Sequence, residues 1–105
     1  PNRGYHPRSL NSNMGWNITN QLMRLNQNLW IAAPEVRTPV LIVHGEKAHS
    51  RYFGEEAYQK LTSGKYADNK RMLIVPDATH CDLYDGGEEN FIPWSEITNF
   101  YKSNL

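Results

Sequence analysis

The chain has 105 residues with 11 basic and 11 acidic side chains, so its formal net charge is zero. This balance excludes the strongly basic surface on which binding to nucleic acid or to anionic lipid depends. No apolar run approaches the roughly 20 residues that a membrane span needs. The single cysteine, Cys81, excludes an internal disulfide and fits a reducing compartment. We therefore expect one small cytoplasmic domain with neither nucleic-acid nor membrane partners.

The first third of the chain is polar and predicts one helix. Residues 1–12 are rich in Pro, Arg, Asn and Ser without periodicity, which indicates an extended lead-in. Five apolar residues then recur at helical spacing: Met14, Ile18, Leu22, Leu25 and Leu29. We expect this amphipathic helix to end at Ala33-Pro34, because the residue before a proline disfavours the α conformation. Trp16 and Trp30 are expected to pack.

Two uninterrupted apolar runs follow, and each predicts a strand buried on both faces. The first begins at Pro39 and stops at the pair His44-Gly45, and the second occupies residues 71–76. A helical pattern separates the two runs. Strand, helix and strand without polar alternation is typical of a βαβ unit in a parallel sheet.

Apolar spacing also predicts the helix between the strands and a last helix after them. The first is indicated by Phe53, Ala57, Tyr58 and Leu61, and the second by Trp94, Ile97, Tyr101 and Leu105. Glu55 and Glu56 are expected in the first turn of the earlier helix, where the dipole favours acids, and Ser63-Gly64 closes it. Pro93 is expected at the first position of the last helix.

Titratable side chains follow both predicted strands. His44, Glu46 and His49 come after the first strand, and His80 and Asp82 come after the second. Because ligands and chemistry gather where parallel strands release the chain into loops, this edge of the sheet is the predicted site.

Three other interpretations of these loops are less favoured. The set His44, His49, His80, Cys81 and Asp82 matches no zinc-site spacing, so we expect neither metal nor cofactor. Cys81 as a nucleophile is disfavoured, because neighbouring side chains on one segment point apart. Tyr52 and Tyr84 are expected to pack rather than to line a cleft.

The predicted sheet is incomplete. Two parallel strands buried on both faces need neighbours at their edges and helices above and below. The chain begins with Pro1 rather than Met, and together these features predict part of a larger protein.

The strands and their loops resemble the C-terminal end of an α/β-hydrolase. The phrases are 38–45 (TPVLIVHG), 45–53 (GEKAHSRYF), 72–76 (MLIVP) and 80–85 (HCDLYD), and they are similar to a bacterial subgroup of serine hydrolases related to dienelactone hydrolases. The resemblance implies a three-layer α/β fold with a parallel sheet. Residues 1–34 are then a lead-in and a helix, and 35–105 are the last two strands and two helices.

The resemblance also implies catalytic roles. His80 takes the place of the general base, which accepts the proton of a nucleophile and returns it to the leaving group. The usual acid position, H-G-x-x-D, holds Ala48, so Glu46 is the expected acid and Asp82 the alternative. The nucleophile motif G-x-S-x-G does not occur in the chain. We therefore expect these residues alone to be inactive.

Two functions are expected from these observations. The first is the C-terminal portion of a serine-dependent, esterase-like hydrolase that acts on ester or acyl bonds of small molecules without a cofactor. The alternative is a non-catalytic α/β module. Such a module would form a homo-oligomer, or dock onto a missing half, through its open sheet edge or apolar helix faces.

Overall fold

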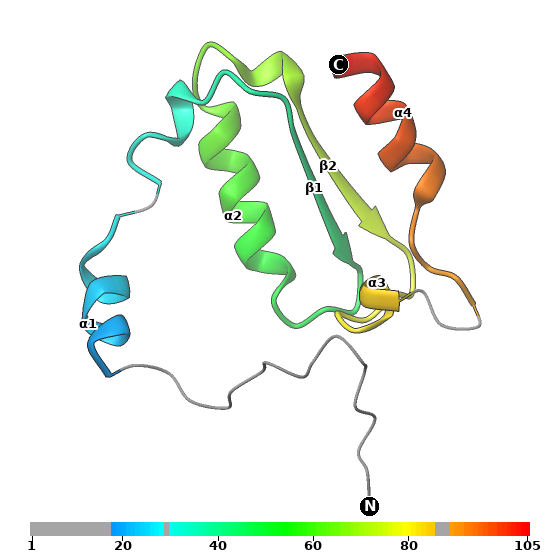
Figure 1. Ribbon diagram of the computed structural model, residues 1–105, viewed down its shortest axis with the longest axis horizontal. Helices are drawn as coiled ribbons and strands as arrows, with labels where there is room; N and C mark the ends of the chain where they lie inside the picture. The colour runs from blue at the N-terminus through cyan, green and yellow to red at the C-terminus, as the bar shows by residue number, and fades with distance from the viewer. Residues whose placement is uncertain (1–17, 29, 86–88) are drawn as a thin grey trace, which may run out of the picture.

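The computed structural model describes residues 18–28, 30–85 and 89–105. The elements in chain order are α1 (Ile18–Asn26), the 3₁₀-helix η2 (Ala33–Glu35), β1 (Val40–Gly45), α2 (Arg51–Thr62), the 3₁₀-helix η3 (Ala67–Asn69), β2 (Lys70–Val75), α3 (Asp82–Asp85) and α4 (Trp94–Asn104) (Figure 1). The predicted lead-in, with Met14, Trp16 and Leu29, lies outside the described residues. None of the described helices is long and apolar enough to cross a membrane.

The sheet has two parallel strands within the described residues, as the sequence predicts. β1 and β2 pair from Val40 opposite Lys70 to Gly45 opposite Val75. A parallel pair needs a crossover connection, and α2 supplies it. α2 and α4 lie on opposite sides of the strands (Figure 1). The described part of the chain is therefore a small α/β fold.

α2 packs on the sheet through two of its predicted residues, with a glycine in place of the third. Its buried residues are Gly54, Ala57 and Leu61, whereas Phe53 is 57% exposed. Gly54 faces β1 so closely that an added Cβ would lie 2.4 Å from Cδ2 of His44. A glycine therefore takes the contact position because the helix and strand approach too closely for a larger side chain. The helix ends at Thr62 with Ser63 as its C-cap, as predicted.

Two helices begin at other residues than predicted, α2 by a few positions and α4 by one. α2 begins at Arg51, so Glu55 and Glu56 lie beyond its first turn. Glu55 instead pairs with Arg51, with 3.0 Å between Oε1 and Nε. α4 begins at Trp94, and Pro93 is its N-cap rather than its first helical residue.

α1 is shorter than predicted. It ends at Asn26, whose side-chain amide donates to the carbonyl of Leu22 at 2.9 Å, and Pro34 lies in η2. Asparagine favours such local bonds over helix continuation, which explains the early end. Leu22 and Leu25 are exposed, and Trp30, which was expected to pack, is 38% exposed.

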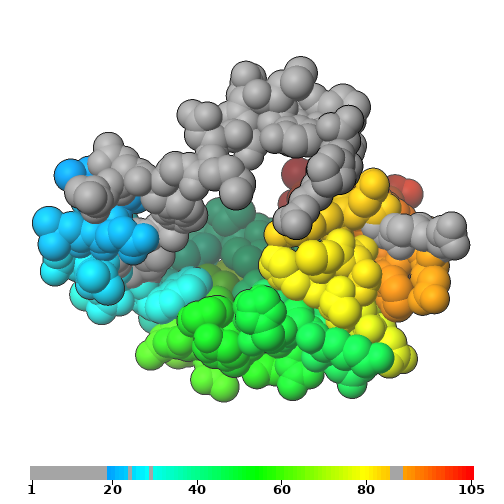
Figure 2. All heavy atoms as spheres, turned by 90° about the horizontal axis from the view of Figure 1, so that it is seen from below, coloured from blue at the N-terminus to red at the C-terminus, as the bar shows by residue number. Residues whose placement is uncertain are grey.

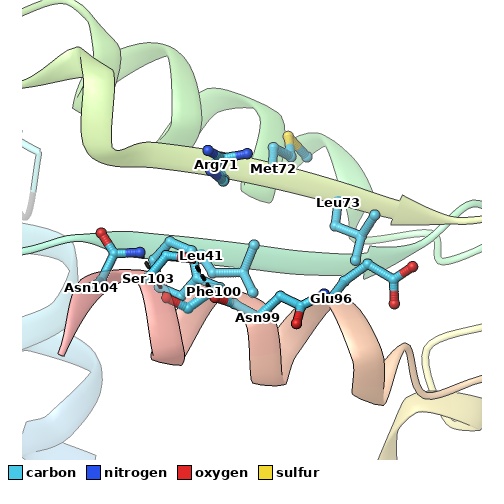
Figure 3. Close-up of a pocket in the computed structure, with 9 residues that line it drawn as sticks. All are labelled: Leu41, Arg71, Met72, Leu73, Glu96, Asn99, Phe100, Ser103 and Asn104. Atoms are coloured by element: carbon cyan, nitrogen blue, oxygen red, sulfur yellow. Dashed lines mark hydrogen bonds between the residues drawn. The ribbon is translucent and has the colours of Figure 1, made fainter.

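The core of the described residues is small. Its buried apolar members are Ala33, Ala48, Ala57, Leu61, Val75 and Ala78. The apolar residues of β1, expected to be buried on both faces, are only half-buried. A groove of about 320 Å³ lies between the strands and α4, with Leu41, Leu73 and Phe100 along it (Figure 3). The strands are half-buried because α4 leaves this groove open.

Lys70 is a buried cation at the start of β2. It is 4% exposed, and its Nζ donates to the carbonyls of Thr38 and Tyr66 at 3.1 Å each and to Oδ1 of Asn69. These bonds connect the strand start to the segment before β1 and to the turn before β2. Lys70 thus aligns the two strands at their amino ends.

We expect Lys70→Met to lower the free energy of unfolding by about 1–3 kcal/mol, because it leaves carbonyl acceptors without their donor. Urea unfolding followed by circular dichroism measures this loss. Arg71→Met is the matched control, since Arg71 is the exposed neighbour on the same strand. Equal stability of the two variants would contradict the role given to the Lys70 ammonium.

Candidate functional site

The loops that follow β1 and β2 lie against one another at the carboxyl edge of the sheet. Gly45 makes this possible, because an added Cβ would lie 2.3 Å from the carbonyl oxygen of Ala78 and 2.7 Å from that of Thr79. The backbone N–H of Lys47 donates to the Ala78 carbonyl at 2.9 Å. The structure thus brings together the two loops that the sequence predicts as the site.

Glu46 joins the two loops through the backbone. Its Oε2 accepts a hydrogen bond from the N–H of Asp77 at 3.0 Å. Asp77 has a positive φ of 60°, so this bond supports a turn that side-chain-bearing residues rarely adopt. Within the described residues no hydrogen bond joins Glu46 to His80. The expected acid is therefore hydrogen-bonded to the neighbouring loop and not to the imidazole of His80.

An exposed ion pair lies beside this contact. Nζ of Lys47 is 2.7 Å from Oδ1 of Asp77. The hydrogen bond and the charge of Asp77 raise the pKa of Lys47, and the same two effects of Lys47 lower the pKa of Asp77. Solvent screens such a surface pair, so it adds little to stability.

Asp82, the alternative acid, is bound to its own loop. Its Oδ2 accepts from both the backbone N–H and the hydroxyl of Thr79, each at 2.7 Å. These bonds lower the pKa of Asp82, with the hydroxyl as the larger cause. These bonds span the turn from Thr79 to Asp82, the first residue of α3. Asp82 therefore shapes the turn that carries His80.

His80 is exposed and its hydrogen-bond partner is a tyrosine. Nε2 of His80 lies 2.7 Å from the hydroxyl oxygen of Tyr84, and the two rings meet edge to face with centroids 5.1 Å apart. The ring of His49 is also near, at 6.4 Å between centroids. Figure 2, which views the molecule from the end where β1 and β2 finish, shows the segment around α3 at the surface beside α2.

A hollow of about 260 Å³ lies under His80. It is lined by Val43, His44, Gly45, His80, Leu83, Tyr84, Ile92, Pro93 and Ile97. None of these is an acid, a lysine or an arginine. The hollow is therefore an apolar recess with two imidazoles and a phenol as its titratable groups.

Sequence reasoning missed the role of Tyr84. It was expected to pack, but its side chain is 73% exposed and bonds to His80. The sequence signal for this contact is the spacing of four residues between His80 and Tyr84, which is the spacing of neighbouring side chains on a helix.

The other candidate residues are packed against the fold or exposed at the surface. The ring of His44 lies against Gly54 of α2, and Ala48, at the usual acid position, is buried. Cys81 is exposed and forms no disulfide. Within the part of the chain that the structure describes, no three His, Cys, Asp or Glu side chains come together as a metal site.

Comparison with known proteins gives one curated relative. No protein-family model matches the chain. This chain is 42% identical over 104 residues to uncharacterized protein PA2218 of Pseudomonas aeruginosa. The match covers 98% of this chain and 26% of that protein. The crystal structure of hypothetical protein PA2218 has a similar fold, with a TM-score of 0.76 and 42% identity over 98% of this chain and 30% of the solved chain. The chain thus spans about a quarter of the length of this relative.

We expect Gly45→Ala to lower the free energy of unfolding by about 1–3 kcal/mol, because the added methyl group forces the two loops apart. Chemical denaturation measures the change. Thr98→Ala, at an exposed position on α4, should stay within about 0.5 kcal/mol of the parent chain. Unchanged stability of Gly45→Ala would show that the loops do not depend on this close approach.

Proposed function

We propose that this chain is the C-terminal, histidine-bearing part of a serine-dependent α/β-hydrolase that cleaves ester or other acyl bonds without a cofactor. One observation carries the proposal: a parallel βαβ unit presents an exposed imidazole, His80, above an apolar hollow at the carboxyl edge of its sheet. In open α/β sheets this edge is where ligands bind.

His80 acts as the general base in this proposal. Its imidazole takes the proton of a serine hydroxyl as the oxygen attacks the acyl carbon, and returns that proton to the departing alcohol. It then activates water to hydrolyse the acyl-enzyme in the same way. Imidazole suits both steps because its charge changes near neutral pH.

The serine and the oxyanion donors belong, in this proposal, to residues outside these 105. The length of the Pseudomonas relative, of which this chain covers 26%, is compatible with such an arrangement. The hollow under His80 would hold the uncharged part of a small substrate, because its walls are mainly aliphatic.

In the complete protein we expect His80→Ala to reduce hydrolysis of a nitrophenyl ester by on the order of 10³-fold or more, because removal of one triad member disables the others. Release of nitrophenol measures the rate. His49→Ala is the matched control, since this exposed imidazole lies beside His80 but should leave the rate unchanged. These 105 residues alone should give no turnover. An unaffected rate in His80→Ala removes His80 from the mechanism.

A second candidate is a non-catalytic module that works by association. The observation that favours it is the set of large apolar side chains exposed on α1, on α4 and at the C-cap of α4: Leu22, Met23, Leu25, Trp94, Tyr101 and Leu105. Only one edge of β1 is paired within the described residues. Unpaired edges and apolar faces of this kind favour association.

If association is the function, the 105-residue chain should be a dimer or larger at micromolar concentration. Light scattering coupled to gel filtration measures its mass. A charge on an exposed apolar face should weaken the assembly, so Leu25→Glu is the test variant, and Lys60→Glu at an exposed polar position is its control. A stable monomer would exclude self-association.

A further inference from the structure

The two carboxylates considered as the acid partner of His80 are hydrogen-bonded elsewhere. Glu46 accepts from the N–H of Asp77, and Asp82 accepts twice from Thr79. Neither is hydrogen-bonded to His80 in the described part of the chain. A general base needs a partner that orients its ring, so that partner has to be sought elsewhere.

The hydroxyl of Tyr84 is in the required place. Its oxygen lies 2.7 Å from Nε2 of His80, and the ring meets the imidazole edge to face. His80 lies in the turn that precedes α3, and Tyr84 lies in α3 four residues later. The N–H of Tyr84 donates to the carbonyl of Cys81 at 3.0 Å. The two hydrogen bonds from Thr79 to Asp82 hold the chain on either side of His80. This pairing is therefore built from local contacts alone.

The direction of the bond decides which nitrogen is free. Neutral imidazole carries one N–H and one lone pair. If the hydroxyl of Tyr84 donates to Nε2, the ring proton is on Nδ1, and no lone pair of His80 is left for a substrate or nucleophile. If Nε2–H donates to the hydroxyl oxygen, Nδ1 keeps its lone pair. Only the second arrangement leaves a base.

We propose that Tyr84 is the positioning residue of His80, accepting its Nε2–H and leaving Nδ1 as the atom that takes the proton. This inference rests on the proposed function of His80. When Nδ1 is protonated, the imidazolium is held by a charge-assisted bond from Nε2–H to the Tyr84 oxygen. A neutral hydroxyl thus performs the task for which the sequence predicted Glu46.

Tyr84→Phe tests the proposal, because it keeps the ring contact and removes the oxygen. In the complete protein we expect kcat for a nitrophenyl ester to fall about 10- to 100-fold, the effect of losing one hydrogen bond to a charged group. KM should stay nearly constant, since the bond serves the base and not the substrate. Tyr52→Phe is the matched control: Tyr52 is also exposed, but its ring lies against Phe53.

Nitrogen NMR of the His80 ring measures the protonation of its two nitrogens, which a purely structural role of Tyr84 would leave unchanged. The resting protein should carry its proton on Nε2 with Nδ1 bare, and the Nε2 signal should shift in Tyr84→Phe. A proton on Nδ1, or an unchanged kcat in Tyr84→Phe, overturns the proposal. If instead His80→Ala leaves hydrolysis intact, the proposed function fails, while the ring spectrum still decides the pairing.

Discussion

The close contact between the loops after β1 and β2 is the constraint on which the candidate site depends. Gly45 lies against the carbonyls of Ala78 and Thr79, at a separation that leaves no room for a side chain. Because the strands are parallel, their carboxyl ends reach the same edge, and this contact joins the loops there. The turn that carries His80 is thereby held beside the end of β1.

The polar groups of these loops have separate tasks. Glu46 and Asp82 satisfy backbone N–H groups and so hold the loops in shape. The imidazole of His80 is hydrogen-bonded to the phenol of Tyr84, four residues later in the chain. A carboxylate close to a histidine in sequence, as Asp82 is to His80, therefore need not act on it. Backbone donors compete for them, and a fixed turn requires those donors to be bonded.

The packing of the described residues is uneven. α2 meets the sheet through small residues at close range, whereas α4 leaves an apolar groove along Leu41, Leu73 and Phe100 (Figure 3). Large apolar side chains on α1 and α4 stay exposed. Both proposed functions use this surface: the first covers it with more of the same protein, and the second with a partner or a second copy.

Local sequence patterns were enough to determine the two strands, their parallel pairing through a helix, and the edge at which His80 lies. The apolar run between Pro39 and Gly45 and the second run at residues 71–76 carry that information within a few residues. Tertiary structure alone decided that Gly54 rather than Phe53 faces the sheet, and that Glu46 bonds to Asp77, 31 residues away in the chain. The reason is physical. Strand formation depends on consecutive residues, whereas a close contact or a hydrogen-bond partner depends on which distant groups the fold brings within reach.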